Sequence, residues 1–318
     1  MDALSDLLRV LRFSGGVFLE SRFRAPWCVW SQIRPEDCGQ PAGAEVVMIG
    51  FHYILDGEMQ FRVGKEAART ALPGQMILVP HNECHFLGSD VSLPALEARP
   101  LVRKANDQEM AQIDHGSGDR VLNHFVCGYL TMAAPRHPVL EALPPVLLAD
   151  VRGQSCADWA ESSFRYAARE HATRRPGSQE ILARLSELLF VEAVREHIER
   201  LPDDATGWLA ALRDPALARA LAALHVQPAH PWTTEGLASQ ACLSRSAFAE
   251  RFSGKLGMPP MSYLTQWRML LASRRLRESS ETIAQIASTV GYESESTFSR
   301  AFAREMGVAP GAWRKCRA

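Results

Sequence analysis

The chain has 318 residues, of which 47% are hydrophobic, and a formal net charge of −1. This length predicts two or three domains with sizeable cores. No segment approaches the roughly 18 consecutive apolar residues of a membrane span. Charged residues (Asp2, Asp6, Arg9, Arg12) stand where a signal peptide needs an apolar stretch, so we expect a cytoplasmic protein.

The seven cysteines are scattered without a Cys-x-x-Cys pair, which argues against a disulfide framework and against a zinc finger. Three of them suggest a tentative redox hypothesis. Cys28 and Cys38 flank a turn-like stretch, and Cys84 adjoins His85, whose charge would lower the pKa of the thiol. The alternative is that these cysteines are unreactive free thiols, as expected in a reducing compartment.

Residues 44–86 have a sequence pattern typical of short β-strands. The segment EVVMIGFHYILDG is apolar up to a turn, EMQFRV follows, and LPGQMILVPHNECHFLG places a Pro-Gly turn before another apolar run. Strands punctuated in this way predict an antiparallel barrel or sandwich.

The front half resembles a cupin, and specifically the cupin-like effector domain at the front of some AraC-type regulators. The segments that carry this resemblance include MDALSDLLRVLRFSGGVFLESRFRAPW, FHYILDGEMQF, LPGQMILVPHNECH, VCGYL and HPVLEALPPVL. The resemblance implies a domain over residues 1–150, a cupin-like β-barrel or sandwich, that senses a small molecule, a metal or an oxidant.

In metal-binding cupins, a histidine on an early strand and another after the Pro-Gly turn point into the barrel. His52 and His85 occupy comparable places here. The His-x-His motif of cupin enzymes is absent, because Tyr53 and Ile54 follow His52, and this argues against a catalytic iron dioxygenase.

The segment NHFVCGYL offers two candidates for a third metal ligand, His124 and Cys127. They are three residues apart, so their side chains face opposite sides of a strand. We favour Cys127, because it shares a face with Phe125 and Tyr129. His52, His85 and Cys127 then form a tentative site for Zn or Cu(I). The alternative is a pair of hydrogen-bonded histidines beside an inert core cysteine.

Residues 151–226 are expected to form a helical linker region. GSQEILARLSELLFVEAVREHIERLP predicts a helix with an apolar stripe, which either mediates dimerisation or packs on the barrel. LPDDATG, residues 201–207, predicts a loop.

The last part of the chain contains two copies of one helix-turn-helix unit, predicted at about residues 234–256 and 282–306. At a displacement of 50 residues Ser244 matches Ser294, Phe248 matches Phe298 and Gly257 matches Gly307, along with Ser246 and Ser296, Phe252 and Phe302, Pro260 and Pro310, and Tyr263 and Trp313. Before the turn the displacement is 49, so the second turn is one residue longer. Thr282 and Gln285 form a capping box, Gly291 suits a left-handed helix end, and a connecting helix lies between the copies.

The charge is unevenly distributed. From residue 228 to the end there are 12 basic and 7 acidic residues, a net charge of +5, which leaves −6 for the rest of the chain. A basic end suggests a polyanionic partner. Each second helix keeps aromatic residues on one face and small or polar residues on the other, as a helix that enters the major groove must, although a plain helical bundle is the alternative.

Residues 227–318 resemble the DNA-binding domain of the AraC/XylS transcription regulators, with GYESESTFSRAFAREMGVAPGAWR close to that family's signature. The family places groove-facing side chains at Arg245, Ser246, Ala249 and Glu250 in the first copy and at Glu295, Ser296 and Arg300 in the second. Arg300 is the strongest base-contact candidate, since Arg pairs bidentately with guanine. Arg245 and Arg251 are either base readers or phosphate contacts, and Glu250 stands where the second copy has Arg300.

The sequence thus predicts an α+β protein, an AraC-type regulator with a cupin-like domain, a helical linker and an all-α DNA-binding domain with two helix-turn-helix units. The expected partners are promoter DNA, an effector, a second copy of the chain and RNA polymerase. A cupin-type metalloenzyme with a regulatory DNA-binding tail, and a purely architectural DNA-binding protein, are the alternatives.

Overall fold

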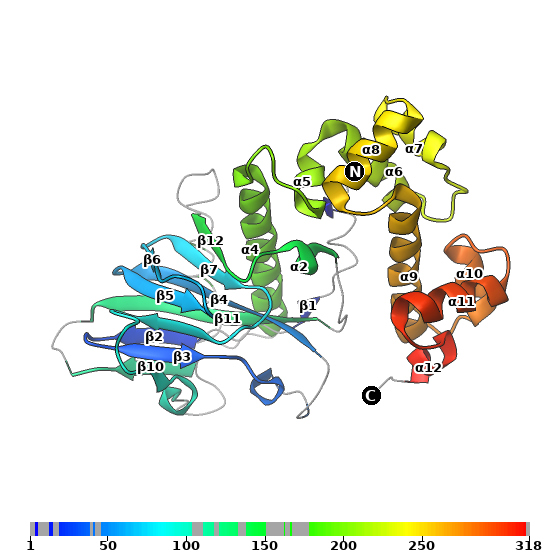
Figure 1. Cartoon of the computed structure of the whole chain (residues 1–318). Coiled ribbons are helices and arrows are strands. Elements are labelled where there is room, and N and C mark those ends of the chain that lie inside the picture. The colour runs from blue at the N-terminus through cyan, green and yellow to red at the C-terminus, as the bar shows by residue number, and fades with distance from the viewer. Residues whose placement is uncertain are drawn as a thin grey trace. The chain divides into compact units, whose positions relative to one another are not determined.

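The computed structural model describes residues 4–5, 13–14, 19–38, 41, 46–103, 111–117, 121–132, 138–150, 162, 166 and 178–315. The chain forms two compact units (Figure 1). The N-terminal unit comprises residues 12–136 and 143–200, and the C-terminal unit comprises residues 201–318 with 1–11 and 137–142. Within the described ranges, every helix lacks either the length or the apolar character needed to span a bilayer.

The N-terminal unit contains two β-sheets. The first has the order β10-β2-β11-β4-β7-β12, with β1 paired to β11, and the second has the order β6-β5-β8-β3-β9. Among the strand pairs of the described residues, only β10 with β2 and β3 with β9 are parallel. The strands are β1 (Phe13–Ser14), β2 (Leu19–Phe23), β3 (Cys28–Ser31), β4 (Val47–Asp56), β5 (Met59–Val63), β6 (Arg69–Ala71), β7 (Gln75–Val79), β8 (His85–Gly88), β9 (Leu96–Glu97), β10 (Ala111–His115), β11 (Asn123–Met132) and β12 (Leu147–Asp150).

One hydrophobic core lies between the two sheets. β5 shows how the sequence builds it, because Met59, Phe61 and Val63 are buried while Gln60 and Arg62 between them are more exposed. These side chains pack with others from both sheets, including Phe23, Ile54, Leu87 and Phe125. Burying one such aromatic side chain contributes about 1.5–3 kcal/mol. The described strands form a sandwich of two sheets rather than one closed barrel.

Gly57 makes the predicted turn between β4 and β5 possible. Its φ of +76° lies in the left-handed region, and a Cβ placed there would come within 1.7 Å of the carbonyl oxygen of Leu122. Only glycine avoids both the backbone strain and this collision.

Helix α4 (Ser178–Arg200) corresponds to the helix expected in the linker region. Leu189, Phe190 and Val194 are buried, and α4 packs on the first sheet. Leu188 on the same helix stays 51% exposed. Only part of the predicted apolar stripe therefore packs on the sheet.

The C-terminal unit is helical, and the loop predicted at residues 201–207 precedes its first long segment. Trp208 donates its indole N–H to the hydroxyl oxygen of Tyr263 at 2.7 Å. This bond joins helix α5 (Trp208–Arg213) to helix α9 (Pro260–Glu278). The helices are α2 (Pro138–Ala142), α5 (Trp208–Arg213), α6 (Pro215–Val226), α7 (Thr234–Ala241), α8 (Arg245–Leu256), α9 (Pro260–Glu278), α10 (Ile283–Thr289), α11 (Glu295–Met306) and α12 (Pro310–Lys315).

The sequence repeat is also a structural repeat. Phe248 and Phe252 of α8 are fully buried with ring centroids 5.4 Å apart, and Phe298 and Phe302 of α11 are buried with centroids 5.6 Å apart. Each second phenylalanine also meets a further aromatic ring edge-on, at 5.8 Å from Tyr263 in the first copy and 5.9 Å from Trp313 in the second. Equivalent residues therefore build the same kind of aromatic core in both copies.

The helix ends follow the predicted signals. Ser244 and Ser294 cap α8 and α11, and both of those helices end at a left-handed glycine. Thr282 and Gln285 form the expected capping box on α10. The short helices of both copies are thus stabilised locally before any packing is counted.

Candidate nucleic-acid interface and core cavity

The second helices of the two copies, α8 and α11, present polar outer faces. Arg245, Ser246 and Glu250 are exposed on α8, and Ala249 between them is half-buried. Glu295, Ser296 and Arg300 are exposed on α11. Each face lies opposite the buried phenylalanines of its own helix, so the residues predicted to contact DNA are accessible in both copies.

The central helix α9 connects the two copies (Figure 1). It packs against α8 of the first copy and against α10, α11 and α12 of the second. Its 19 residues correspond to a length of about 28 Å at 1.5 Å per residue. This is close to the roughly 34 Å that separates successive major grooves on one side of a duplex.

Most of the basic side chains in residues 228–315 are already bonded within the molecule. They form ion pairs, donate hydrogen bonds to carbonyl oxygens or lie over an aromatic ring. The held residues are Arg251, Lys255, Arg268, Arg274, Arg275, Arg277, Arg304 and Arg314. The net charge of this segment therefore overstates the number of cations that face a partner.

Three basic residues in the same range differ from the others. Arg245, Arg300 and Lys315 make no hydrogen bond, ion pair or ring contact with any other residue that the structure describes. Arg245 lies at the start of α8 and Arg300 in the middle of α11. Each outer face therefore carries one free guanidinium.

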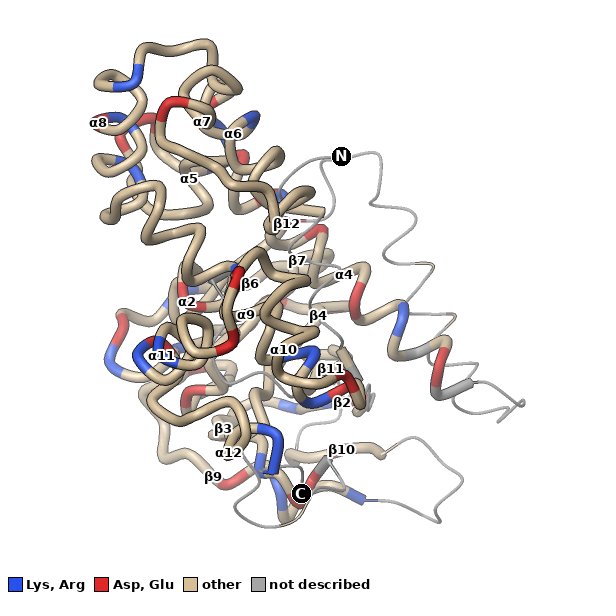
Figure 2. Tube along the Cα trace, turned by 90° about the vertical axis from the view of Figure 1, so that its right-hand side faces the viewer, with Lys and Arg blue, Asp and Glu red and all other residues tan. Residues whose placement is uncertain are grey.

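The charges of the two outer faces are reversed. Arg245 of the first copy corresponds to Glu295 of the second, and Glu250 of the first corresponds to Arg300. Figure 2 shows basic and acidic residues interspersed along both helices. At the start of α8 a base would meet Arg245, whereas at the start of α11 a base would meet Glu295. The two faces therefore differ in the bases that they can bind.

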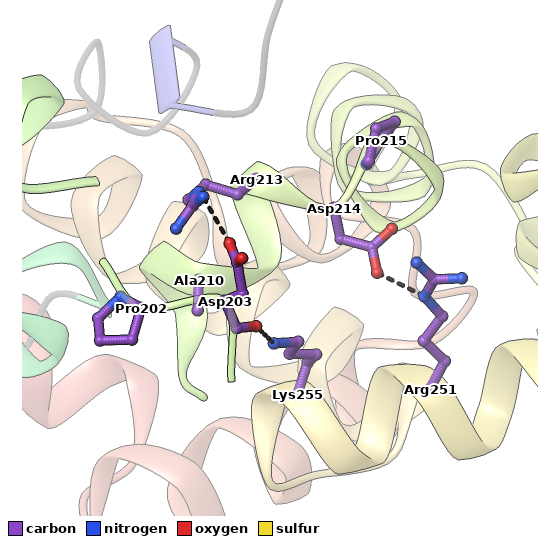
Figure 3. Close-up of a pocket in the computed structure, with 8 residues that line it drawn as sticks. All are labelled: Pro202, Asp203, Ala210, Arg213, Asp214, Pro215, Arg251 and Lys255. Atoms are coloured by element: carbon purple, nitrogen blue, oxygen red, sulfur yellow. Dashed lines mark hydrogen bonds and ion pairs between the residues drawn. The ribbon is translucent and has the colours of Figure 1, made fainter. Parts of the chain in front are cut away.

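Arg251 is the predicted contact residue that the structure holds elsewhere. Its Nε–H donates to Oδ2 of Asp214 at 2.5 Å, and the Asp214 side chain is only 6% exposed (Figure 3). One turn further along α8, Lys255 donates to the carbonyl oxygens of Asp203 and Ala205. These two cations bind the loop before α5 and the start of α6 to α8.

A cavity of about 430 Å³ opens among strands of the N-terminal unit. Most of its wall is apolar, with Phe23, Val29, Leu87, Ile113 and Phe125 among the lining residues. Its polar lining residues include Ser21, His52, His85 and Cys127. A cavity of this size and composition is typical of a small-molecule site.

The predicted ligands His52, His85 and Cys127 do come together. Nε2 of His52 lies 2.8 Å from Nε2 of His85, and Nδ1 of His52 lies 2.9 Å from Sγ of Cys127. Burial lowers the pKa of both histidines and raises the pKa of Cys127 to about 12, so all three groups are neutral at physiological pH.

This arrangement does not fit a metal centre. The sulfur of Cys127 and the nitrogen of His85 approach different nitrogens of the His52 ring, whereas metal ligands must converge on one point at about 2.0–2.3 Å. Among the described residues, no three His, Cys, Asp or Glu side chains are grouped to hold one ion. The side chains form a row, with His52 in the middle.

His124, the alternative third ligand, points elsewhere. Its Nε2 lies 2.8 Å from Oε1 of Glu20, and its Nδ1 lies 3.5 Å from a carboxylate oxygen of Asp56. Cys127, and not His124, is thus the residue that reaches His52. The alternation of side chains along β11 explains this choice.

The expected lowering of the Cys84 pKa is wrong. Burial raises the pKa of Cys84, and His85 is itself shifted toward its neutral form and supplies no positive charge. Burial also raises the pKa of Cys28. The side chain of Cys38 lies outside the described residues.

Sequence reasoning missed two residues that organise these sites. Asp214 caps α6 by accepting from the backbone amides of Ala216 and Leu217, and it also binds Arg251. The Asp-Pro pair at positions 214 and 215 is a recognisable start signal for a helix, so the cap was predictable. Ser21, whose Oγ lies 3.9 Å from Sγ of Cys127, gave no signal in the sequence.

Two family models match the chain in sequence. One, described as a cupin, matches residues 2–199, and the other, described as a helix-turn-helix domain, matches residues 237–316. Both matches agree with the division between a β-sandwich and duplicated helices.

Three relatives extend the match over most of the chain. The transcriptional regulator AlkR of Acinetobacter baylyi is 32% identical over 99% of this chain and 99% of its own length. A protein of Streptomyces lividans described as an AraC-like transcription regulator is 43% identical over 84% of this chain and 87% of its own length. The RCS-specific transcriptional activator RclR of Escherichia coli is 28% identical over 99% and 98%. The chain is therefore a member of the AraC family of DNA-binding transcription regulators, with a cupin domain in front of its helix-turn-helix domain.

Proposed function

We propose that this regulator reads two successive major grooves of a promoter with α8 and α11, and that a small molecule bound in the core cavity changes how these helices engage DNA. The free guanidinium groups of Arg245 and Arg300 carry the first part of the proposal. An unpaired guanidinium on an outer helix face is suited to bidentate hydrogen bonds with guanine O6 and N7.

The remaining predicted contacts take supporting roles in this proposal. Ser246 and Ser296 are short enough to let the backbones of α8 and α11 approach the bases, and Ala249 leaves room beside them. Glu250 and Glu295 suit cytosine, whose amino group donates to a carboxylate. Because the charged pairs are reversed between the copies, the two half-sites would differ in sequence.

The second part of the proposal concerns the effector. The cavity offers a largely apolar wall with a smaller number of polar side chains, a combination that binds and orients a small molecule. A molecule that binds more tightly to one arrangement of the protein than to another shifts the population toward that arrangement. Regulation then requires no enzymatic step.

We further propose a homodimer. Ile181, Leu185 and Leu188 follow one another at helical spacing on α4, and Leu188 is 51% exposed. Leu188→Glu should shift the sedimentation coefficient of the full-length protein from dimer to monomer. Leu96→Glu, a matched change at an exposed leucine outside α4, should not shift it.

The DNA-binding part is tested with two matched variants of α11. Arg300→Ala should lower the affinity for the best DNA sequences and relax the preference at particular base pairs by about 1–3 kcal/mol. Arg304→Ala removes another exposed arginine of α11, one that is paired with Glu305, and it should leave the base preference unchanged. Uniform weakening by Arg300→Ala across all DNA sequences would instead assign Arg300 to the phosphate backbone.

A further inference from the structure

We infer that the core cavity takes an uncharged, largely apolar molecule, held at its polar end by the hydroxyl of Ser21 beside the hydrogen-bonded row of Cys127, His52 and His85, with no metal ion. The inference rests on the proposed effector function and specifies the chemistry of that effector. It depends on two observations, the direction of the hydrogen bonds in the row and the charges around the cavity.

The hydrogen positions in the row follow from its fixed end. Nδ1 of His85 lies 2.9 Å from the carbonyl oxygen of Glu83, which can only accept, so this nitrogen carries the hydrogen. Nε2 of the neutral His85 ring is then an acceptor, and the facing Nε2 of His52 must donate to it. Nδ1 of His52 is therefore an acceptor in turn, and it accepts the thiol hydrogen of Cys127.

This order uses every ring nitrogen of both histidines. No N–H group of the row is left to donate to a ligand, and no ring nitrogen is left to bind a metal ion. The Ser21 hydroxyl differs, because its contact with Cys127 Sγ is 3.9 Å long and weak. Ser21 can therefore exchange this contact for a hydrogen bond with a hydroxyl, carbonyl or N–H group of a ligand.

The charges around the cavity disfavour an ionic ligand. Glu36, Asp37 and Arg99 are the charged side chains among its described lining residues, and their sum is −1. Arg99 is already paired with Asp37, its Nε lying 3.0 Å from Oδ1. A bound carboxylate would lose its hydration without gaining a free cation. A bound ammonium group would meet carboxylates only at the solvent-exposed Glu36 and Asp37, and none among the buried apolar residues.

The inference is tested by isothermal titration calorimetry on the full-length protein with three matched pairs of ligands. The pairs are 1-hexanol and hexanoate, 1-octanol and octanoate, and benzyl alcohol and benzoate, all at pH 7. In at least one pair the alcohol should bind at least about tenfold more tightly than the carboxylate, and chelator treatment should not change its affinity. Equal or tighter binding of the carboxylates would overturn the inference while leaving an effector role intact. The absence of binding by all six compounds would contradict both the inference and the proposed effector site.

Two variants and one control locate the binding in the cavity. Ser21→Ala should lower the affinity for the alcohols by about fivefold, the effect of one lost hydrogen bond. Val102→Arg places a cation at the cavity wall and should raise the affinity for the carboxylates, whereas Leu96→Arg, at an exposed position that does not line the cavity, should not. Thermal unfolding of each variant checks that the protein is folded. Unchanged affinities in folded Ser21→Ala and Val102→Arg would overturn the inference.

Discussion

Arg251 of α8 forms an ion pair with Asp214, the residue that caps the start of α6. The guanidinium Nε–H of Arg251 reaches Oδ2 of Asp214 at 2.5 Å, while Oδ1 of Asp214 accepts from the amides of Ala216 and Leu217 at 3.0 and 3.3 Å. One buried carboxylate thus caps α6 and holds α8 against it. Arg251 would then act on DNA mainly by positioning α8.

This relationship predicts a stability effect. Arg251→Ala leaves the buried carboxylate of Asp214 without its cation and should lower the free energy of unfolding by about 1–3 kcal/mol. Its effect on DNA affinity should be uniform across sequences. Arg304→Ala, which removes a surface ion pair, should change the stability by less than about 0.5 kcal/mol. Denaturant titration and binding to a panel of DNA sequences measure both quantities. Loss of preference at a single base pair in Arg251→Ala would identify Arg251 as a base reader.

The turns of the two helix-turn-helix units predict that glycine is favourable in both, so adding it to the first and removing it from the second should change the stability in opposite directions. Cys242 and Gly291 occupy equivalent positions with φ of 56° and 84°, and only the second is glycine. Cys242→Gly should raise the free energy of unfolding by about 1 kcal/mol, because the left-handed conformation strains a residue with a Cβ.

Gly291→Ala should lower the stability by about 2 kcal/mol or more, since its Cβ would also lie 2.8 Å from backbone atoms of Ala229. Cys242→Ala is the control, because it removes the thiol and keeps the strain. A gain in Cys242→Ala equal to that in Cys242→Gly would show that the thiol, rather than the backbone, sets the cost.

The environments of the thiols predict their order of alkylation. Cys242 is exposed, whereas burial raises the pKa of Cys28, of Cys84 and, to about 12, of Cys127. Among these four cysteines, iodoacetamide at pH 8 should therefore label Cys242 first and Cys127 at least about a hundredfold more slowly, as measured by peptide mass spectrometry. Labelling in denaturant serves as the control. Faster labelling of Cys28 or Cys84 than of Cys242 would favour the redox hypothesis.

Glu20 predicts how stability changes in acid. Its hydrogen bond with His124, and then the positive charge of Arg22, lower the pKa of Glu20 below the ordinary value of 4.5 against the opposing effect of burial. The folded state therefore gains stability above about pH 4.5, and this gain is lost as the pH falls through the lowered pKa.

Glu20→Gln loses the ion pair with Arg22 and the charge-assisted hydrogen bond with His124, so it should be less stable than the wild type by about 1 kcal/mol at pH 6–7 and should match it in strong acid. Urea titrations from pH 3 to pH 7 measure this difference. Glu66→Gln, at an exposed carboxylate of the same unit, should follow the wild type throughout. A constant difference between Glu20→Gln and the wild type over the whole range would contradict the assignment.

Local signals in the sequence predicted the duplicated helices well. Thr282, Gln285 and Gly291 act within a few residues of their own positions, and the recurring phenylalanines report the same packing twice. The prediction of a barrel or sandwich followed from short apolar runs separated by turn residues, such as those around Gly57. In each case the information lies in neighbouring residues, so no knowledge of the tertiary structure was needed.

Two features of the sites depended on tertiary structure. Arg251 meets Asp214 across 37 residues of chain, and nothing near either residue indicates the other. The resemblance to cupins brought His52, His85 and Cys127 together, but the order of their contacts depends on how each ring is turned. That order decides between a metal centre and a hydrogen-bonded row, and the sequence does not contain it.

We propose that α8 and α11 read different bases in successive grooves, and selection of binding sites from random DNA distinguishes the contribution of each helix. The wild-type protein should select two unlike tracts with centres about 10 base pairs apart. Arg245→Ala should lose the preference in one tract only, and Arg300→Ala should lose it in the other tract only. Loss of preference in the same tract for both variants, or uniform weakening without any change in the selected sequence, would contradict the claim.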